Sequence, residues 1–232
     1  MSVITCKVKK LEQVNDHVYH LELTTTQSFD FKAGQYLQVV MGEKDKRPFS
    51  IASTPGQTNL ELHIGATEGH SYAKQVIDLC KEQGQLEVEV GLGEAQLRQD
   101  SDRPILLLAG GTGFSYVQSI ARHLEQHKPD HQVLLYWGGK NLQSMYADKA
   151  MKQWQQDHKG FSYVPVIEHP DEGWQGKTGY VHLAVMEDID NLQDYDIYIA
   201  GHFDMVKIVR DDFIAQGAVR EHMFADAFAY ID

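Results

Sequence analysis

The stretch PILLLAGGTG, residues 104–113, decides the fold of this chain. Its first seven residues form a near-continuous apolar run, which is typical of a parallel strand buried on both faces of a sheet. The glycines that follow allow a tight turn, and a helix predicted over 115–126 would point free backbone N–H groups at a bound phosphate. This order of elements indicates a nucleotide-binding α/β unit. The motif lacks the third glycine of GxGxxG and the lysine of a P-loop, so a glycine turn without a ligand stays an equal alternative at this point.

Strands and helices keep alternating from this stretch towards the end of the sequence. Such alternation predicts a doubly wound parallel sheet, here with five strands. The predicted strands are 104–110, 133–139, 161–167, 196–201 and 222–228, and the predicted helices are 115–126, 144–157 and 204–215.

The first hundred residues follow a different rhythm, in which side-chain character alternates with period two. In HVYHLELTTT, residues 17–26, Tyr19, Leu21 and Leu23 share one face. Short strands of this kind, punctuated by glycine and proline, predict an N-terminal antiparallel β-barrel. The predicted strands are 3–11, 17–26, 35–41, 47–53, 59–66 and 85–90, with one helix over 71–82. The change of rhythm near 98–103 divides the chain into two predicted domains, 1–100 and 101–232.

Composition bounds the possible partners and cofactors. The 232 residues are 42% hydrophobic and 10% aromatic, which is enough for a real core. A net charge of -12 disfavours nucleic acid and anionic membranes as partners. Two cysteines, Cys6 and Cys80, form no CxxC motif, so an iron–sulfur cluster or a structural zinc site is not expected. No run approaches 18 apolar residues, and we expect a cytoplasmic protein.

Two more predicted strands end in glycine. Trp137, Gly138 and Gly139 close one, and the segment 201–205 (GHFDM) follows another. Carboxyl ends of parallel strands meet at one edge of a sheet, so three glycine ends together outline a groove floor that a dinucleotide could cross.

The segment Arg47, Pro48, Phe49 and Ser50 is the informative one in the first domain. An arginine is a fixed fork of donors that suits a phosphate or an electron-rich ring. Pro48 removes a ladder donor and therefore predicts an edge strand, while the Ser50 hydroxyl can donate and accept. Taken alone, these residues are better interpreted as a surface arginine and a strand serine than as a binding site.

Together these segments resemble the ferredoxin–NADP reductase superfamily over the whole chain. Residues 47–50 are similar to its flavin-binding Arg-x-Tyr-Ser/Thr segment. Gly111, Thr112 and Gly113 match its Gly-Thr-Gly turn, and 201–205 match its Cys-Gly-x-x-x-Met turn with Ala200 in place of the cysteine. The segments DKRPFSIAST, ELHIGA, LLLAGGTGFSY, YWGG, DIYIAG and FADAFAYI closely resemble the bacterial NAD(P)H:flavin oxidoreductases, a group that includes the flavin reductases of luminous bacteria.

The resemblance implies a flavin-binding barrel over 1–100 and an NAD(P)H-binding domain over 101–232. It implies that hydride passes directly from nicotinamide C4 to flavin N5, with Ser50 as the catalytic residue that hydrogen-bonds N5. The flavin-binding residues it implies are Tyr36, Arg47, Pro48, Phe49, Ser50, His63, Ile64, Gly65, Ala66, Tyr72 and Phe228. The NADH- or NADPH-binding residues it implies are Gly110, Gly111, Thr112, Gly113, Phe114, Ser115, Trp137, Gly138, Gly139, Gly201, Phe203, Asp204 and Met205. Asp226 and Tyr230 are expected to return towards the flavin with Phe228.

Two departures from the family pattern bear on the cofactors. Relatives with permanently bound flavin carry Gly-x-x-Ser/Thr at the start of the barrel helix, where this chain has Glu68, Gly69, His70 and Ser71. The negative charge of Glu68 would repel a flavin phosphate, so riboflavin, FMN and FAD are expected to act as substrates or weakly bound groups. Ser115 stands where many relatives have proline, which is not expected to abolish nicotinamide binding.

Two other functions compete with a free-flavin reductase. One is a ferredoxin or flavodoxin reductase with tightly bound FAD, against which the acidic charge counts. The other is a non-catalytic electron-transfer or nucleotide-sensing subunit. Lys140 is weighed as a contact for the 2′-phosphate of NADPH against a plain surface lysine. No metal site is expected, because His17 and His20 point to opposite faces of a strand, while His123 and His127 have no carboxylate beside them.

Overall fold

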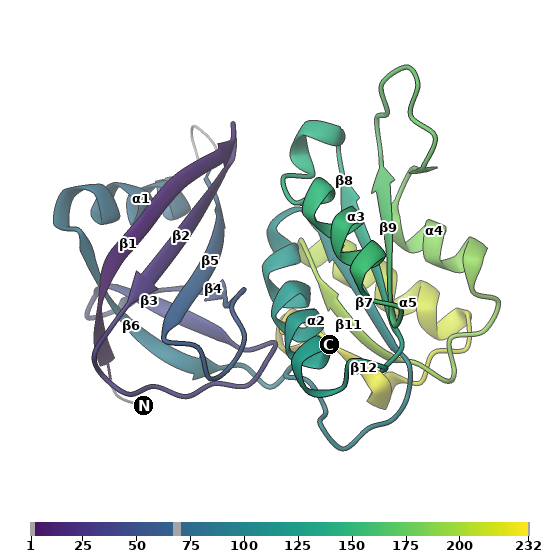
Figure 1. The fold of residues 1–232 in the computed structure, drawn as a ribbon, viewed down its shortest axis with the longest axis horizontal. Helices are drawn as coiled ribbons and strands as arrows, with labels where there is room; N and C mark the ends of the chain where they lie inside the picture. The colour runs from purple at the N-terminus through teal and green to yellow at the C-terminus, as the bar shows by residue number, and fades with distance from the viewer. Residues whose placement is uncertain (1–2, 67–70, 232) are drawn as a thin grey trace. The chain divides into compact units, whose positions relative to one another are not determined.

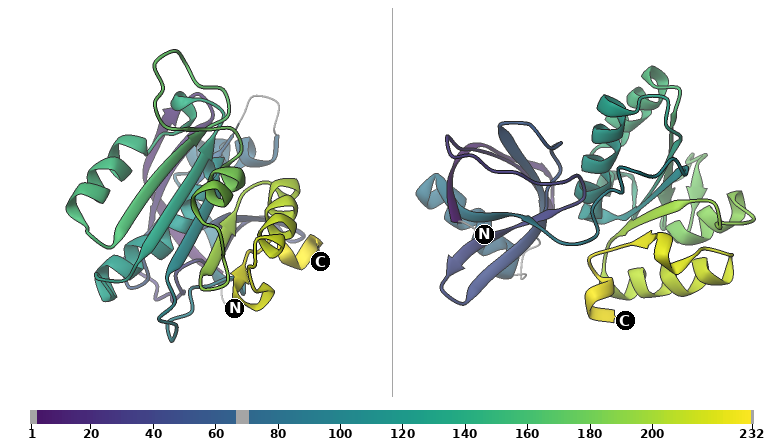
Figure 2. Two further views of the ribbon diagram at one scale, coloured as in Figure 1. Left: turned by 90° about the vertical axis from the view of Figure 1, so that its right-hand side faces the viewer. Right: turned by 90° about the horizontal axis from the view of Figure 1, so that it is seen from below.

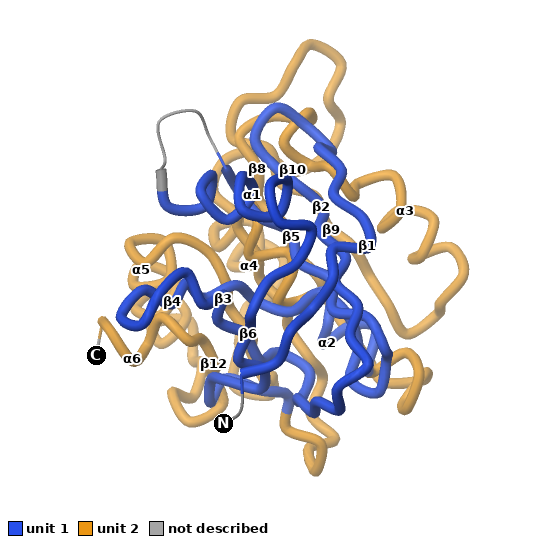
Figure 3. Tube along the Cα trace, turned by 90° about the vertical axis from the view of Figure 1, so that its left-hand side faces the viewer, with its two compact units in different colours: residues 1–97, 118–123 blue, residues 98–117, 124–232 orange. Residues whose placement is uncertain are grey.

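The computed structural model describes residues 3–66 and 71–231, which divide into two compact units (Figure 1). Unit 1 comprises 1–97 and 118–123, and unit 2 comprises 98–117 and 124–232 (Figure 3). The short segment 118–123 joins unit 1 through side-chain contacts, such as the 2.7 Å hydrogen bond from Ser119 Oγ to the Ser53 carbonyl. The functional domains 1–100 and 101–232 stay a prediction.

Unit 1 is built on a six-stranded antiparallel sheet with the order β4-β3-β6-β1-β2-β5. The six strands predicted from period two are confirmed, with ends that differ by a few residues. They are β1 Val3–Asn15, β2 Val18–Thr24, β3 Tyr36–Gly42, β4 Asp45–Ser50, β5 Asn59–Gly65 and β6 Gln85–Leu92. The sheet curls until its two edges approach, and just beyond β4 the Ala52 N–H donates to the Glu61 carbonyl on β5.

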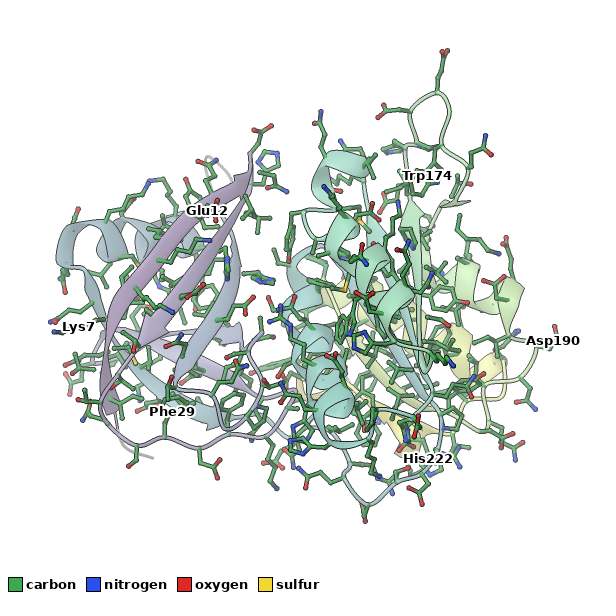
Figure 4. All side chains as sticks on the ribbon, viewed as in Figure 1. Lys7, Glu12, Phe29, Trp174, Asp190 and His222 are labelled. Atoms are coloured by element: carbon green, nitrogen blue, oxygen red, sulfur yellow. The ribbon has the colours of Figure 1, made fainter. Side chains whose placement is uncertain are left out.

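Alternation along these strands separates the core from solvent. Leu21 and Leu23 on β2 and Leu62 on β5 are fully buried, whereas Lys7 and Glu12 on β1 are exposed (Figure 4). Helix α1, Ser71–Gln83, adds Val76, Ile77 and Cys80 to the same core. The helix predicted over 71–82 is therefore confirmed.

Unit 2 is a parallel six-stranded sheet with the order β10-β9-β8-β7-β11-β12. Its strands are β7 Ile105–Gly110, β8 Val133–Gly139, β9 Phe161–Ile167, β10 Lys177–Thr178, β11 Asp196–Ala200 and β12 Met223–Phe224. The expected number of five strands is wrong, because β10 is two residues long and too short to produce a periodic signal. The last strand is also shorter than predicted, since the Phe228 N–H donates to the Ala225 carbonyl and closes a turn that leads into α6, Phe228–Ile231.

Helices cover both faces of this sheet, with α2 and α3 on one face and α4 and α5 on the other (Figure 2). They are α2 Phe114–His127, α3 Asp148–Asp157, α4 Val181–Asp188 and α5 Phe203–Ala215. Helix α3 begins later than the predicted residue 144, because Leu142–Ser144 forms a separate 3-10 turn capped by the Asn141 side chain. The sequence missed α4 because it is short and buried at successive positions, which leaves no polar stripe. No helix within 3–66 or 71–231 is long and apolar enough to cross a membrane.

Candidate functional site

The centre of the unit 2 sheet is a topological switch point. From β7 the chain proceeds to β8 on one side, whereas β11 pairs with β7 on the other. Ala109 lies opposite Ala200 in register, so the turns that follow β7 and β11 start side by side. Gly110 lies opposite Gly138 on β8, which places all three glycine ends on one edge of the sheet, as the sequence predicted. Open α/β sheets bind their ligands at such an edge.

Three of these glycines lie in the close packing between the two central turns. A Cβ on Gly110 would lie 2.6 Å from Met205 Sδ, and a Cβ on Gly201 would lie 2.7 Å from the same sulfur. A Cβ on Gly113 would collide with the backbone of Ala200. Met205 thus fills the space between both turns and fixes how closely they approach.

Gly111 differs from its neighbours because it faces open space. It has φ +54°, a left-handed conformation that favours glycine, and no atom lies within 4 Å of a Cβ built there. The next helix, α2, has Gly113 at its N-cap with no side-chain cap and no acidic residue in its first turn. The Phe114 N–H already donates to the 3-10 turn Gly111–Gly113 that precedes it, so the N–H groups of this turn and the open glycine are the features that fit the phosphates of a dinucleotide.

Trp137 and Phe114 lie beneath this turn and not at its surface. Both side chains are fully buried, and their rings stack at 4.1 Å. Trp137 Nε1 donates to the Gly111 carbonyl at 2.9 Å, and Tyr146 meets the Trp137 ring edge-on at 5.1 Å. These aromatics position the turn, while their predicted contact with the cofactor stays a prediction. The sequence offered no signal for Tyr146.

The remaining nicotinamide-side residues differ in exposure. Thr112 is half-buried, whereas Phe203 and Asp204 are exposed in the first turn of α5. The negative charge of Asp204 makes this helix end less suited to a phosphate than that of α2. Ser115 is buried, and its Oγ has no hydrogen-bond partner among the described residues.

The third glycine end is packed against neighbouring elements. A Cβ on Gly138 would lie 2.9 Å from Val181 Cβ on α4, and one on Gly139 would lie 2.6 Å from Ser144 Oγ. Lys140, directly after β8, is exposed, and its contact with a 2′-phosphate stays a prediction.

In unit 1 the segment predicted to face the flavin forms an edge strand, as Pro48 indicated. Tyr36 on β3 lies opposite Ser50 on β4 in register. Pro48 is exposed, while Phe49 and Ser50 are half-buried, so part of this strand remains accessible to a ligand.

Arg47 is buried and held by partners from two elements. Its Nε donates to Asp45 Oδ1 at 3.0 Å and one Nη to Asp45 Oδ2 at 2.6 Å, and the same Nη lies 2.6 Å from Gln75 Oε1. Its other Nη donates to the Tyr72 carbonyl, and the Tyr72 ring lies 4.5 Å from the guanidinium. The hydrogen bonds with Asp45 raise the pKa of Arg47 and lower that of Asp45. The sequence missed Asp45 and Gln75, although Asp45 shares a strand face with Arg47.

The neighbouring strand offers fewer side chains than expected. Ile64 and Ala66 are buried in the unit 1 core, which leaves their backbone and the exposed Gly65 for ligand contact. His63 is buried, and its Nε2 lies 3.0 Å from Glu61 Oε1.

Glu61 is the centre of a polar cluster that the sequence did not reveal. Arg122 donates to its Oε2 at 2.8 Å, and Gln118 Nε2 donates to Oε1 at 3.1 Å. His20 Nε2 lies 3.3 Å from Oε1 because His20 and His63 are opposite each other on β2 and β5. Burial would raise the pKa of Glu61, but hydrogen bonds from both histidines and the Arg122 charge hold it well below its usual range.

This cluster also bears on the expectation of no metal site. The ligand atoms of His20, Glu61 and His63 lie within 4.8 Å of one another and are of types that zinc accepts. Arg122 and Gln118 already engage both carboxylate oxygens. The strand pairing that joins His20 to His63 could not be read from the sequence, which is why the cluster was missed.

The two aromatic residues near the C-terminus that were expected near the flavin differ in their exposure to solvent. Phe228 is buried in the unit 2 core with the Arg220 guanidinium 4.1 Å from its ring centre. Tyr230 is 74% exposed and lies 5.6 Å from the Phe203 ring. Flavin contact by Phe228 stays a prediction. Glu68, Gly69 and His70 lie outside the described residues.

Family models match both parts of the chain. A FAD-binding domain model matches residues 3–115, and an oxidoreductase NAD-binding domain model matches residues 107–211. An Aliivibrio fischeri protein named NAD(P)H-flavin reductase is 46% identical, over 98% of this chain and 99% of its own length. The chain belongs to the NAD(P)H-flavin reductase family. A Vibrio harveyi protein of the same name is 44% identical over the same shares.

Solved structures of other proteins share the fold. A cytochrome P450 reductase from Amycolatopsis superposes with a TM-score of 0.86 at 24% identity, covering 97% of this chain and 69% of that one. A ferredoxin NADP+ reductase from Neisseria gonorrhoeae superposes with a TM-score of 0.79 at 17% identity, covering 95% and 94%. The expected fold class is confirmed, as is the assignment of this family member as an oxidoreductase.

Proposed function

We propose that this chain uses NADH or NADPH to reduce free flavins, namely riboflavin, FMN and FAD, and releases the reduced flavin. The observation that carries the proposal is similarity over the full chain to proteins named NAD(P)H-flavin reductase. The two matched domain types, for FAD and for NAD, agree with it.

Each unit would contribute one binding surface. In unit 2 the open turn at Gly111 and the backbone N–H groups of the 3-10 turn Gly111–Gly113 would hold the phosphates of the nicotinamide nucleotide. In unit 1 the accessible residues Pro48, Phe49 and Ser50 of β4 would contact the isoalloxazine ring. The nicotinamide supplies the hydride and the flavin accepts it, so no protein nucleophile is required. Ser50 Oγ is the group we assign to flavin N5, because a hydroxyl both donates and accepts.

The negative charge of Glu68 supports the proposal that the flavin is a substrate and not a permanently bound group. Glu68 stands where a flavin phosphate would need uncharged or positive groups. The loss of such hydrogen bonds lowers affinity enough to turn a prosthetic group into a diffusing molecule.

The reduced flavin would pass to an acceptor outside this chain. We infer a monooxygenase, a luciferase or ferric iron, each of which takes electrons from free reduced flavin. We place the reaction in the cytoplasm, where the buried free thiols Cys6 and Cys80 would stay reduced.

The test is the visible spectrum of the purified chain, followed by NADH oxidation with and without riboflavin. We expect a colourless protein that oxidises NADH only when riboflavin is present. A yellow protein whose stoichiometric flavin is bleached by NADH would instead establish the rival, a reductase with tightly bound FAD. A protein that binds both molecules but turns over neither would establish the nucleotide-sensing alternative.

A further inference from the structure

The cations along β4 and at the start of α1 are each paired with a carboxylate. Lys46 lies 2.7 Å from Glu89, Arg47 lies 2.6 Å from Asp45, and Lys74 is paired with Asp78. These are the positive side chains of β4 and of the first turn of α1 as the structure describes them. The surface formed by β4 and the first turn of α1, which is predicted to face the flavin, therefore carries positive groups but little net positive charge.

The pair at Arg47 is the tightest of the three. Asp45 accepts from two different nitrogens of the guanidinium in a bidentate arrangement, the strongest geometry that an arginine forms with a carboxylate. Gln75 and the Tyr72 carbonyl engage the same group. The fork that arginine offers to a phosphate is thus already occupied by the protein.

Exposure shows which charge an incoming ligand meets. The Asp45 side chain is 46% exposed, whereas that of Arg47 is 7% exposed. A phosphate that approaches from solvent therefore meets the carboxylate of the pair before the guanidinium. Repulsion by Asp45 and the engagement of Arg47 act in the same direction.

Riboflavin and FMN differ in the charge of the phosphate group. Riboflavin carries no phosphate, whereas a phosphate monoester such as that of FMN carries a charge of about -1.5 to -2 at neutral pH. We propose that Asp45 is a specificity-determining residue that neutralises Arg47 and thereby removes the advantage of a phosphorylated flavin. This inference rests on the proposed function and deepens it: the chain selects the uncharged part of the flavin, and Asp45 sets that choice.

The decisive variant is Asp45→Asn, which removes the charge and keeps the size of the side chain. Gln75 and the Tyr72 carbonyl would still hold the guanidinium in place. Glu43→Gln is the matched control, because Glu43 is exposed in the turn between β3 and β4 and its loss changes the net charge equally. The kcat/KM values for FMN and for riboflavin are measured for the parent and both variants.

We expect Asp45→Asn to raise the FMN-to-riboflavin ratio about tenfold, a size set by one charge-assisted hydrogen bond. Added salt should diminish this gain, because dissolved ions screen the charge of the phosphate as it approaches from solvent. The ratio for Glu43→Gln should equal that of the parent. An unchanged ratio in a folded Asp45→Asn protein, or an equal rise in both variants, would overturn the inference.

A measurement on the unmodified chain keeps the inference testable if Asp45→Asn fails to fold. Quenching of flavin fluorescence gives the dissociation constants of riboflavin and FMN at low and high salt. We expect FMN to bind no more tightly than riboflavin, with little dependence on salt. Tighter FMN binding that weakens steeply with salt would contradict the role of Asp45. Absence of riboflavin reduction by the unmodified chain would refute the proposed function instead, and the binding comparison would still stand.

Discussion

The two units present different groups to a negatively charged ligand. In unit 2 the turn after β7 presents backbone N–H groups and an open glycine, Gly111, with no acidic residue in the first turn of α2. In unit 1 the cations along β4 are each bound to a carboxylate, as Arg47 is to Asp45. No side chain caps the start of α2, whereas a carboxylate holds the Arg47 guanidinium. The two units therefore differ in the groups that they offer to a phosphate.

The glycine edge of unit 2 should be the less tolerant of the two surfaces. A Cβ added in Gly113→Ala would lie 2.6 Å from the Ala200 carbonyl carbon, and backbone atoms cannot move aside cheaply. We expect a loss of about 3 kcal/mol in the free energy of unfolding from this overpacking. The displaced turn should lower kcat/KM for NADH about 100-fold. Gly42→Ala is the control, since nothing lies within 4 Å of a Cβ there. Equal behaviour of the two variants would show that the close approach of the central turns is unimportant.

The second largest effect on stability is expected at Glu61, whose charge is paired within unit 1. Its pKa is lowered in the folded state, so its contribution to stability is full above the ordinary value of 4.5 and is lost as pH falls below that value. Glu61→Gln removes the charge that His20, His63 and Arg122 share. We expect a loss of about 2 kcal/mol at pH 7, below the usual cost of breaking a fully buried pair because Arg122 is 35% exposed.

Denaturant unfolding at several pH values checks this expectation. The difference between the parent and Glu61→Gln should shrink as pH falls through and below 4.5, since protonation then removes the same charge from the parent. The control is Glu87→Gln, an exposed residue on β6. A pH-independent difference would mean that Glu61 stabilises unit 1 by packing alone.

Catalysis should depend on Ser50 more than binding does. Ser50→Ala removes the hydroxyl assigned to flavin N5 but leaves the half-buried strand β4 in place. We expect kcat to fall about 30-fold, within the range for groups that act in the transition state, and the dissociation constant of riboflavin to change less than threefold. Stopped-flow reduction and fluorescence titration separate the two quantities. Ser28→Ala, on an exposed loop, is the control, and equal losses in kcat and binding would leave Ser50 only a packing role.

The sequence predicted those features whose signals are local. Period two along β2 and the apolar run at 104–110 gave the two sheets, and Pro48 correctly placed β4 at an edge. The two-residue strand β10 and the eight-residue helix α4 carry no clear periodic signal and were missed. The glycine motifs located the edge of the sheet correctly, because the carboxyl ends of parallel strands must meet there.

Features that depend on strand register or on contacts between elements were beyond the sequence. His20 and His63 meet at Glu61 only because β2 and β5 pair in one register. Arg47 is held by Gln75 from a helix far along the chain. The Trp137 ring is fully buried under the neighbouring turn, a packing relation that the sequence could not show, and its contact with the cofactor stays a prediction. A residue type at a strand end thus indicates the site, while the role of that residue depends on packing.

The smallest effect should come from the bond that holds the open turn. Trp137→Phe keeps an aromatic ring against Phe114 and deletes the hydrogen bond from Nε1 to the Gly111 carbonyl. The lost bond should cost about 1 kcal/mol, which corresponds to a roughly fivefold rise in KM for NADH if it acts mainly by fixing the turn. Trp154→Phe, whose ring stacks on Phe161 away from the glycine edge, is the matched control for loss of an indole. A lower unfolding free energy with an unchanged KM would mean that the hydrogen bond from Trp137 stabilises the fold but is not needed to hold Gly111 in its binding conformation. A raised KM with unchanged kcat would mean that the buried Trp137 side chain supports nucleotide binding by holding the Gly111 backbone in place. In unit 1, by contrast, the proposed binding surface is set by a pair of side chains, Arg47 and Asp45.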